Sequence, residues 1–182
     1  MVLLENIKNN HPAFLETLKH RFLDDQRHSA LNKFLELGIK NKKDEEYRYT
    51  NLREITEKDY NFFPTETHTI SKEQIAELHL GEENFDWIVF INGQLHKELS
   101  KISIENVEFL SFNFALNDAK HKEVFDNYFN TIAAKDLAFT NLNEAFCKHG
   151  FFLKVPKNMV IEKPIHVFYI SQNQEENTFY NT

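Results

Sequence analysis

The sequence predicts an α+β fold that consists of a helical N-terminal region, a β-hairpin near residues 86–99 and further strands toward the C-terminus. Apolar residues recur every three or four positions over the first 38 residues, a period typical of amphipathic helices. Asn92-Gly93 follows an apolar run, and this dipeptide favours the tight turn of a hairpin. Residues 151–155 alternate in polarity and residues 165–170 are almost all apolar, as in strands that other elements cover.

Composition and charge exclude several classes of protein. With 18 Phe among 182 residues, the chain can bury the core of one domain, or of one domain and part of a second. The net charge is -7 and the basic residues do not cluster, so we expect no nucleic-acid partner. No apolar run reaches membrane-spanning length or resembles a signal peptide, so we expect no membrane association. The single Cys147 rules out an internal disulfide framework and fits the reducing cytoplasm, where we expect the protein to lie.

The first segment, up to Gly38, is predicted to be helical, as one long helix or as two. Pro12 is expected near the first turn, where its missing N–H costs little. If the helix breaks near His28, Ser29 is the expected cap of the second helix. The two apolar stripes consist of Phe14, Leu15, Leu18, Phe22 and Leu23, and of Leu31, Phe34, Leu35 and Leu37.

An acidic and aromatic segment follows, in which Asp44, Glu45 and Glu46 precede Tyr47 and Tyr49. We interpret it as a loop or short helix whose tyrosines pack on the preceding helices. A docking surface and an acid/base pair are the alternatives. Adjacent carboxylates on a helix do not face each other, and acid–base catalysis needs a shaped pocket, so the packing interpretation is favoured.

The middle of the chain is predicted to contain one short helix and the hairpin. Residues 56–84 are polar, and Ile75 with its apolar neighbours indicates a short helix there. Residues 87–91 would form the first strand of the hairpin. Asn92-Gly93 would supply a type I′ turn, and residues 94–99 would return as the second strand.

The third segment alternates between strands and helices. Residues 104–112 are predicted as a strand, and residues 116–129 and 134–149 as helices. Gly150 would end the second helix with a positive φ. From residue 151 onward we expect strands of a larger parallel sheet, because both faces of the run 165–170 are apolar.

The histidines and the cysteine raise the question of a metal or catalytic site. The nine His residues are scattered without an HxxxH or HxH pair, so a zinc site would need ligands from distant segments. A nucleophilic cysteine needs an electropositive environment, whereas Cys147 is expected near a helix C-terminus, whose dipole raises a thiol pKa. We therefore expect no catalytic residue, cofactor or metal. The alternative is a stand-alone metal-binding or enzymatic domain that uses Cys147, His149 and His166.

Three segments together resemble a known family in their order and spacing. They are Asp44–Thr50, Val89–Gly93, and a third set that joins Leu142–Phe146, Gly150, Val155–Lys157 and Pro164–His166. The set resembles the N-terminal part of the SufB/SufD family of iron–sulfur cluster assembly proteins, its SufD members in particular. Tyr47 stands where the family often has Trp, and Ile39-Lys40 where it often has Leu-Pro. Asn158 stands where it often has Gly, and Asn tolerates the left-handed turn.

The resemblance implies a function and an architecture for the chain. It implies a helical domain over residues 1–150 with the hairpin, followed at 151–182 by the first strands of a right-handed parallel β-helix. It also implies a non-catalytic scaffold subunit that acts with a SufB-like paralogue and a SufC-like ATPase, with no site residue carried over. The chain is expected to be a fragment of a longer protein. Its open strand edge at residues 159–180 is expected to self-associate or to be poorly ordered; the alternative is that the apolar strand folds back on the helices.

Overall fold

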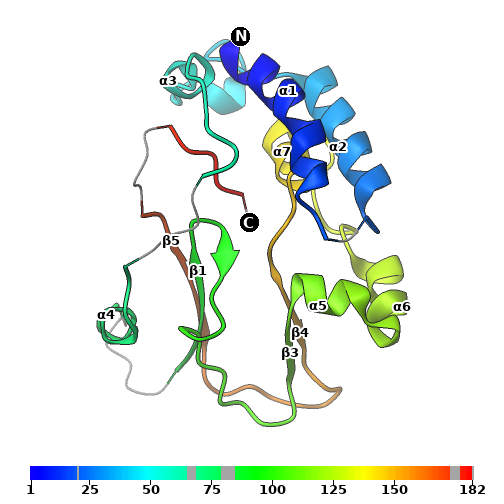
Figure 1. Ribbon diagram of the computed structural model, residues 1–182, viewed down its shortest axis with the longest axis vertical. Coiled ribbons are helices and arrows are strands. Elements are labelled where there is room, and N and C mark those ends of the chain that lie inside the picture. Colours follow the sequence, from blue (N-terminus) through cyan, green and yellow to red (C-terminus); the bar gives the residue numbers. More distant parts are fainter. Residues whose placement is uncertain (20, 65–68, 79–84, 173–176, 182) are drawn as a thin grey trace.

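The protein combines a group of helices with two small sheets (Figure 1). The computed structural model describes residues 1–19, 21–64, 69–78, 85–172 and 177–181. Parts of the predicted polar segment 56–84 and of the predicted open edge 159–180 therefore lie outside the described residues. Among the described residues, no helix has both the length and the apolar character needed to cross a membrane.

The helical layer contains α1 (Val2–Glu16), α2 (Asp24–Leu37) and α7 (Ala138–Ala145), which pack side by side (Figure 1). α1 ends at Glu16 and α2 begins at Asp24, so the break expected near residue 28, with its cap at residue 29, is wrong. Two aspartates begin α2 there, where negative charge is favourable to the helix dipole. The core of the layer consists of Leu3, Ile7, Phe14, Leu15, Ala30, Leu31, Phe34, Ile39, Phe62, Ala138, Leu142, Ala145 and Phe146.

Two residues with special backbone chemistry lie in or beside these helices. Gly38 has φ +63° and directly follows α2, which confirms that it ends the helix. Pro12 lies near the end of α1 and not near its first turn, so that expectation is wrong. Its side chain is exposed, as is Lys8, whose carbonyl lacks the usual N–H partner, so water can replace that partner.

The larger sheet has the strand order β2-β1-β5 and contains the hairpin. It consists of β1 (Asp86–Ile91), β2 (Gln94–Leu95) and β5 (Ile165–Ile170). Asn92 and Gly93 have φ of 51° and 79°, which confirms a turn with positive φ at both positions. The return strand β2 is shorter than predicted, because the chain turns from His96 onward and pairs again with β1 only at an isolated bridge. β1 and β5 are parallel, with Asp86 opposite Ile165 and Ile91 opposite Ile170.

The smaller sheet pairs β3 (Glu108–Ser111) with β4 (Phe151–Lys154) in antiparallel orientation. The expectation of parallel pairing from residue 151 onward is therefore wrong for β4, although β5 is parallel. The reason is long-range: β4 pairs with residues that lie 40 to 46 positions earlier, and the sequence of β4 carries no information about the direction of that strand. The parallel β-helix stays a prediction. The domain boundary at residue 150 also stays a prediction; both sheets pair a strand before this residue with a strand after it.

The remaining helices are shorter than the sequence predicted. The predicted helix 116–129 is divided into α5 (Phe112–Asn117) and α6 (Ala119–Tyr128). Asp118 lies between them and accepts a hydrogen bond from the backbone N–H of Lys120 at 3.0 Å, so a helix cap interrupts the pattern. The predicted helix 134–149 forms only as α7, and Gly150 lacks the expected positive φ because it directly precedes β4.

Short helices occupy the connections. They are the 3-10 helix η1 (Glu45–Tyr47), α3 (Arg53–Thr56) beside α1, and α4 (Lys72–Glu77). α4 confirms the predicted short helix and begins with a capping box between Ser71 and Gln74. Its Ile75 is buried against β1, so α4 covers one face of the larger sheet.

Candidate functional site

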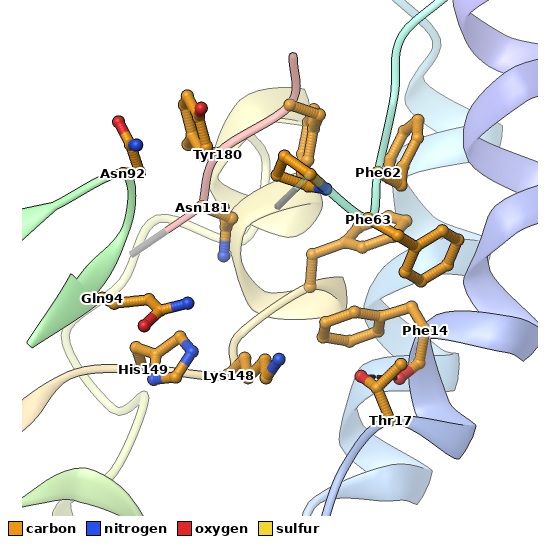
Figure 2. A pocket seen from close by; sticks show the side chains of 13 residues that line it. Phe14, Thr17, Phe62, Phe63, Asn92, Gln94, Lys148, His149, Tyr180 and Asn181 are labelled. Carbon is orange, nitrogen blue, oxygen red and sulfur yellow. Dashed lines mark hydrogen bonds between the residues drawn. The ribbon is translucent and has the colours of Figure 1, made fainter. Parts of the chain in front are cut away.

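A pocket of about 220 Å³ lies where the helical layer, the hairpin turn and the C-terminal segment meet (Figure 2). Figure 2 shows phenylalanine rings on the side of the helices, and polar side chains on the side of the hairpin and of the loop after α7. The apolar lining is formed by Phe14, Phe62, Phe63, Pro64, Phe146, Phe179 and Tyr180. The polar lining is formed by Thr17, Asn92, Gln94, Lys148, His149 and Asn181.

Buried side chains from α1 and α2 hold the loop that carries Lys148 and His149. Arg27, only 2% exposed, donates from Nε and Nη2 to the carbonyl oxygen of Cys147 at 3.0 and 2.8 Å. His11, 1% exposed, donates from Nε2 to the carbonyl oxygen of Ala145 at 3.1 Å. The last carbonyls of a helix have no partner within the helix, so His11 completes the end of α7, and Arg27 holds the carbonyl of Cys147 two residues beyond it. They thereby fix the direction in which the loop leaves it.

Burial lowers the pKa of both capping groups. Loss of solvent is the main cause for His11, and the hydrogen bond to Ala145 opposes it only in part, so the imidazole is neutral at pH 7. Burial also lowers the pKa of Arg27, with Cys147 and Asp24 opposing it, but a guanidinium remains charged. Asp24 is the counterion, with Oδ1 at 3.3 Å from Nη1 of Arg27.

The hairpin turn and the C-terminal segment form the other walls of the pocket. The side chain of Asn92 donates to the carbonyl oxygen of Gln172 at 3.1 Å and accepts from its N–H at 2.8 Å. Asn181 donates from its amide to the carbonyl oxygen of Asn143 at 3.0 Å. Phe179 stacks on Phe62 with ring centroids 4.5 Å apart. Asn92 and Asn181 are thus held by residues outside the pocket, and Phe179 is held by a second lining ring.

The structure does not bring together the three residues of the metal or enzyme alternative. His149 lines the pocket, whereas the ring of His166, on β5, lies 4.4 Å from that of Phe85. Cys147 packs instead beside the apolar cluster that includes Phe112. In the described part of the chain, no three His, Cys, Asp or Glu side chains are grouped so that they could hold a metal ion.

The environment of Cys147 keeps it in the thiol form. Burial raises its pKa to about 11; the nearby Glu144 acts in the same direction, and the charge of Arg27 opposes both. The raised pKa agrees with the expectation from the sequence. Its main cause is burial and not a helix dipole, since Cys147 lies beyond α7. A thiolate is the reactive and metal-binding form, so Cys147 is a poor nucleophile near neutral pH.

The acidic and aromatic segment is a short, solvated turn. Asp44 accepts a hydrogen bond from the backbone N–H of Asn41 at 2.8 Å, so it stabilises the turn before η1. Tyr47 is half-buried, whereas Tyr49 is 92% exposed. The expected packing of Tyr49 is therefore wrong, because the tight turn after η1 directs it outward. The side chain of Glu46 lies outside the described residues.

A buried histidine that the sequence reasoning missed lies between two carboxylates. His121 on α6 is 2% exposed, with Nε2 3.0 Å from Glu108 and Nδ1 3.1 Å from Asp118. Both contacts are within ion-pair distance, although neither has the geometry of a hydrogen bond. A hydrogen bond from Lys120, with a smaller effect of His121, lowers the pKa of Glu108. The cluster joins α6 to β3.

Arg27 and His11 were also missed, yet the sequence contains a signal for both. Arg27 lies four residues after Leu23 and four before Leu31, on the buried stripe of α2. His11 lies four residues after Ile7 on the buried stripe of α1. A polar residue at such a position needs a buried partner, but the partner's identity is not local information.

The comparison with protein families identifies the chain. The N-terminal region of SufBD proteins matches residues 5–167, which is most of the chain. The chain therefore belongs to the SufBD family and represents its N-terminal region. This is the family that the three sequence segments indicated, and assignment to the SufD members stays a prediction.

Two relatives agree with this assignment. An iron–sulfur cluster assembly SufBD family protein of Synechocystis sp. is 24% identical over 159 residues, which cover 87% of this chain and 35% of the relative. Another, from Staphylococcus saprophyticus, is 24% identical over 141 residues, 74% of this chain and 29% of the relative. The chain thus spans about a third of the length of the curated relatives that it matches.

Proposed function

We propose that the chain is part of a non-catalytic scaffold subunit of the SUF iron–sulfur cluster assembly machinery, and that it acts with a SufB-like paralogue and a SufC-like ATPase. The observation that carries the proposal is the family match over residues 5–167, together with relatives named for iron–sulfur cluster assembly. The proposal places the chain in the cytoplasm, the reducing compartment that its single cysteine favours.

The state of Cys147 supports a scaffold over the metal-binding or enzymatic alternative. A thiol with a pKa of about 11 is protonated at neutral pH, whereas a nucleophile or a cluster ligand has to be a thiolate. Packing is a sufficient explanation for Cys147, since it packs against the apolar cluster that contains Phe112 and Phe125. His166 is likewise explained by its contact with the ring of Phe85.

Exposed apolar side chains support a role in binding other proteins. Tyr128 at the end of α6 is 71% exposed, and Ile132 in the following turn is 97% exposed. Two hollows of about 360 and 310 Å³ share Tyr128 and Phe129 in their linings. Contiguous exposed apolar surface is typical of protein–protein contacts, and a scaffold subunit requires such contacts.

The free edge of β5 supports either a longer sheet within the parent protein or pairing with a second molecule. The N–H groups of Asp86 and Asn92 donate to the carbonyls of residues 164 and 170, so the even-numbered residues of β5 face β1. The backbone groups of Ile165, Val167 and Tyr169 then point to the other edge, with which no described strand pairs. The proposal takes β5 as an early strand of a parallel β-helix. In the 182-residue chain, we expect this edge to pair with a second copy.

Genetic complementation tests the scaffold role against the alternative. The coding segment for residues 5–167 is deleted in frame from the parent gene, and aconitase activity is measured as a reporter of cluster supply. We expect the deletion to lower this activity, and both the wild-type gene and a Cys147→Ala gene to restore it fully. Failure of Cys147→Ala to restore activity at equal protein level would favour the enzymatic alternative. No effect of the deletion would contradict both.

A further inference from the structure

The outer edge of β4 carries backbone groups that have no partner. The N–H of Phe112 donates to the carbonyl oxygen of Gly150 at 3.0 Å, which sets the alternation of the antiparallel ladder between β3 and β4. The backbone groups of Phe152 therefore face β3, whereas those of Phe151 and Leu153 face away from it. Within the described residues, no strand pairs with this outer edge and no other hydrogen bond reaches its backbone groups. Such an edge is a template for one more strand.

A hollow of about 360 Å³ borders the same edge. It is lined by the three consecutive residues Phe151, Phe152 and Leu153, by Phe112, and by the C-terminal half of α6 with Phe129. Side chains of consecutive strand residues alternate between the two faces of a sheet, so a hollow that touches all three lies along the backbone edge and not over one face. No residue of β3 is among its described lining residues, which places the hollow on the outer side of β4.

The lining of this hollow favours an apolar side chain. Among its described lining residues, the only polar side-chain group is the hydroxyl of Tyr128. Phe152 faces α6, since its ring centroid lies 4.9 Å from that of His121 and 6.0 Å from that of Phe125. A residue directly opposite Phe152 on an added strand would place its side chain on this face, beside the hollow. The volume is near the lower end of the roughly 300–1,000 Å³ typical of ligand pockets, so it suits a large side chain and not a folded surface.

The end of the edge favours a carboxylate. Lys154 is the last residue of β4 and is exposed, and no acidic side chain of the described residues lies within ion-pair distance of its ammonium group. Glu108 lies opposite it in the ladder but pairs with Lys120 instead, at 2.9 Å. Lys154 and Phe152 lie on the same face, because they are two positions apart on one strand. An added strand would match both if it carried an acidic residue two positions from an apolar one.

We propose that the outer edge of β4 binds an extended segment of a partner protein as an additional antiparallel strand. One apolar side chain of the segment, opposite Phe152, fills the hollow beside α6, and an acidic residue two positions earlier in the segment meets Lys154. Antiparallel pairing is the more stable arrangement for a short strand. Few residues of β4 offer outward backbone groups, so the hollow supplies both specificity and part of the affinity. The inference rests on the proposed scaffold function, because it names what the apolar surface at Tyr128 would bind.

The probe is the peptide acetyl-Thr-Glu-Val-Phe-Val-Thr-amide, whose Glu would lie opposite Lys154 and whose Phe would lie opposite Phe152. It is titrated into the ¹⁵N-labelled chain, and the backbone amides are followed by NMR and by hydrogen exchange. We expect saturable shifts of the amides of Phe151 and Leu153 at about millimolar concentration, since a short peptide binds weakly. At ten times the dissociation constant, their exchange should slow about tenfold, in proportion to the unbound fraction. The amide of Phe152, which already pairs with β3, is the internal control.

Two methylated peptides separate strand pairing from general apolar attraction. N-methylation of both Val residues removes the donors that would face β4, so it should weaken binding by about tenfold or more. N-methylation of the Phe residue is the matched control, because its N–H would point away from β4; its affinity should stay within about threefold of the parent peptide. A peptide with Gln in place of Glu should bind about twofold to fivefold more weakly, and this difference should vanish in the Lys154→Gln variant. Lys157→Gln, at an exposed position beyond β4, should leave the difference intact.

Variants of the chain test each wall of the site. Leu153→Pro removes an N–H that faces outward and leaves the N–H groups that pair with β3, so it should abolish peptide binding while the ladder remains. Tyr128→Ser should weaken binding because it removes one side of the hollow; Tyr128 is 71% exposed, so the fold should tolerate the change. The methylated peptides require no variant, so they decide the question even if Leu153→Pro fails to fold.

Three results would overturn the proposal. The first is the absence of saturable shifts of Phe151 and Leu153 at peptide concentrations up to about 10 mM. The second is equal affinity for the two methylated peptides, which would indicate an apolar ligand site without strand pairing. The third is protection of both amides in the free chain that increases with chain concentration, which would make a second copy the occupant. Peptide binding is measured without the complementation assay, so a failure of this inference and a failure of the scaffold function are distinguishable.

Discussion

Replacement of Gly93 by alanine should destabilise the protein for two separate reasons. Gly93 has φ +79° in the hairpin turn, a conformation that residues with a Cβ adopt at a cost of about 1–2 kcal/mol. A Cβ at this position would also lie 2.7 Å from the carbonyl oxygen of Asn181 and 3.3 Å from the nitrogen of the same residue. The contact is with backbone, so it cannot be relieved by a rotamer change and the C-terminal segment has to move.

The two contributions give an expected magnitude. Overpacking of this kind costs about 1–3 kcal/mol, so Gly93→Ala should lower the free energy of unfolding by about 2–5 kcal/mol in all. That is a large part of the roughly 5–15 kcal/mol typical of folded domains. Urea denaturation followed by far-UV circular dichroism measures it.

Deletion of residues 181 and 182 separates the two contributions. In the shortened chain the clash is absent, so the cost of Gly93→Ala should fall to about 1–2 kcal/mol, the backbone strain alone. Gly38→Ala is the control. Gly38 has φ +63°, and a Cβ at this position would meet no atom within 4 Å, so the substitution should lower the free energy of unfolding equally in both chains. An equal cost of Gly93→Ala with and without the last two residues would refute the reasoning.

Three further predictions follow from the buried polar groups and the strand edge. Arg27→Met should destabilise the fold by about 2–4 kcal/mol in urea denaturation, because it leaves the half-buried carbonyl of Cys147 without its donors and Asp24 without its counterion. The control Arg53→Met, at an exposed position, should cost less than about 0.5 kcal/mol. Equal costs would contradict the role of Arg27 in holding the loop after α7. His11 has a lowered pKa when folded, so the folded state binds fewer protons and stability should fall as pH drops below 6.5. The His11→Gln variant should lose less stability over this pH range. A pH dependence of stability equal to that of the wild type would contradict the role of His11. Light scattering should show that the wild-type chain self-associates and that the double variant Ile165→Lys, Val167→Lys does not. A wild-type chain that stays monomeric at high concentration would exclude pairing through β5.

Local chemistry was sufficient to predict several elements from the sequence. Asn92-Gly93 adopts the expected positive φ angles, and Asn158, where the family often has Gly, has φ 66° as the left-handed turn requires. The short helix α4 and the end of α2 at Gly38 were also predicted from neighbouring residues. The family was likewise apparent from three short segments. For each of these turns and helices, the determining interactions lie within a few residues of one another, so the local sequence contains both partners.

Only the tertiary structure decided how the strands pair and where the pocket lies. The apolar run 165–170 looks the same whether its neighbour is β1 or a strand of another molecule, because a parallel ladder joins backbone groups that every residue has. Lys148 and His149 were expected at the end of a helix, yet they line a pocket because buried Arg27 and His11 hold the loop after α7. Those partners are more than 100 residues apart in sequence, and a hydrogen bond to a backbone carbonyl leaves no trace in the identity of the residue that accepts it.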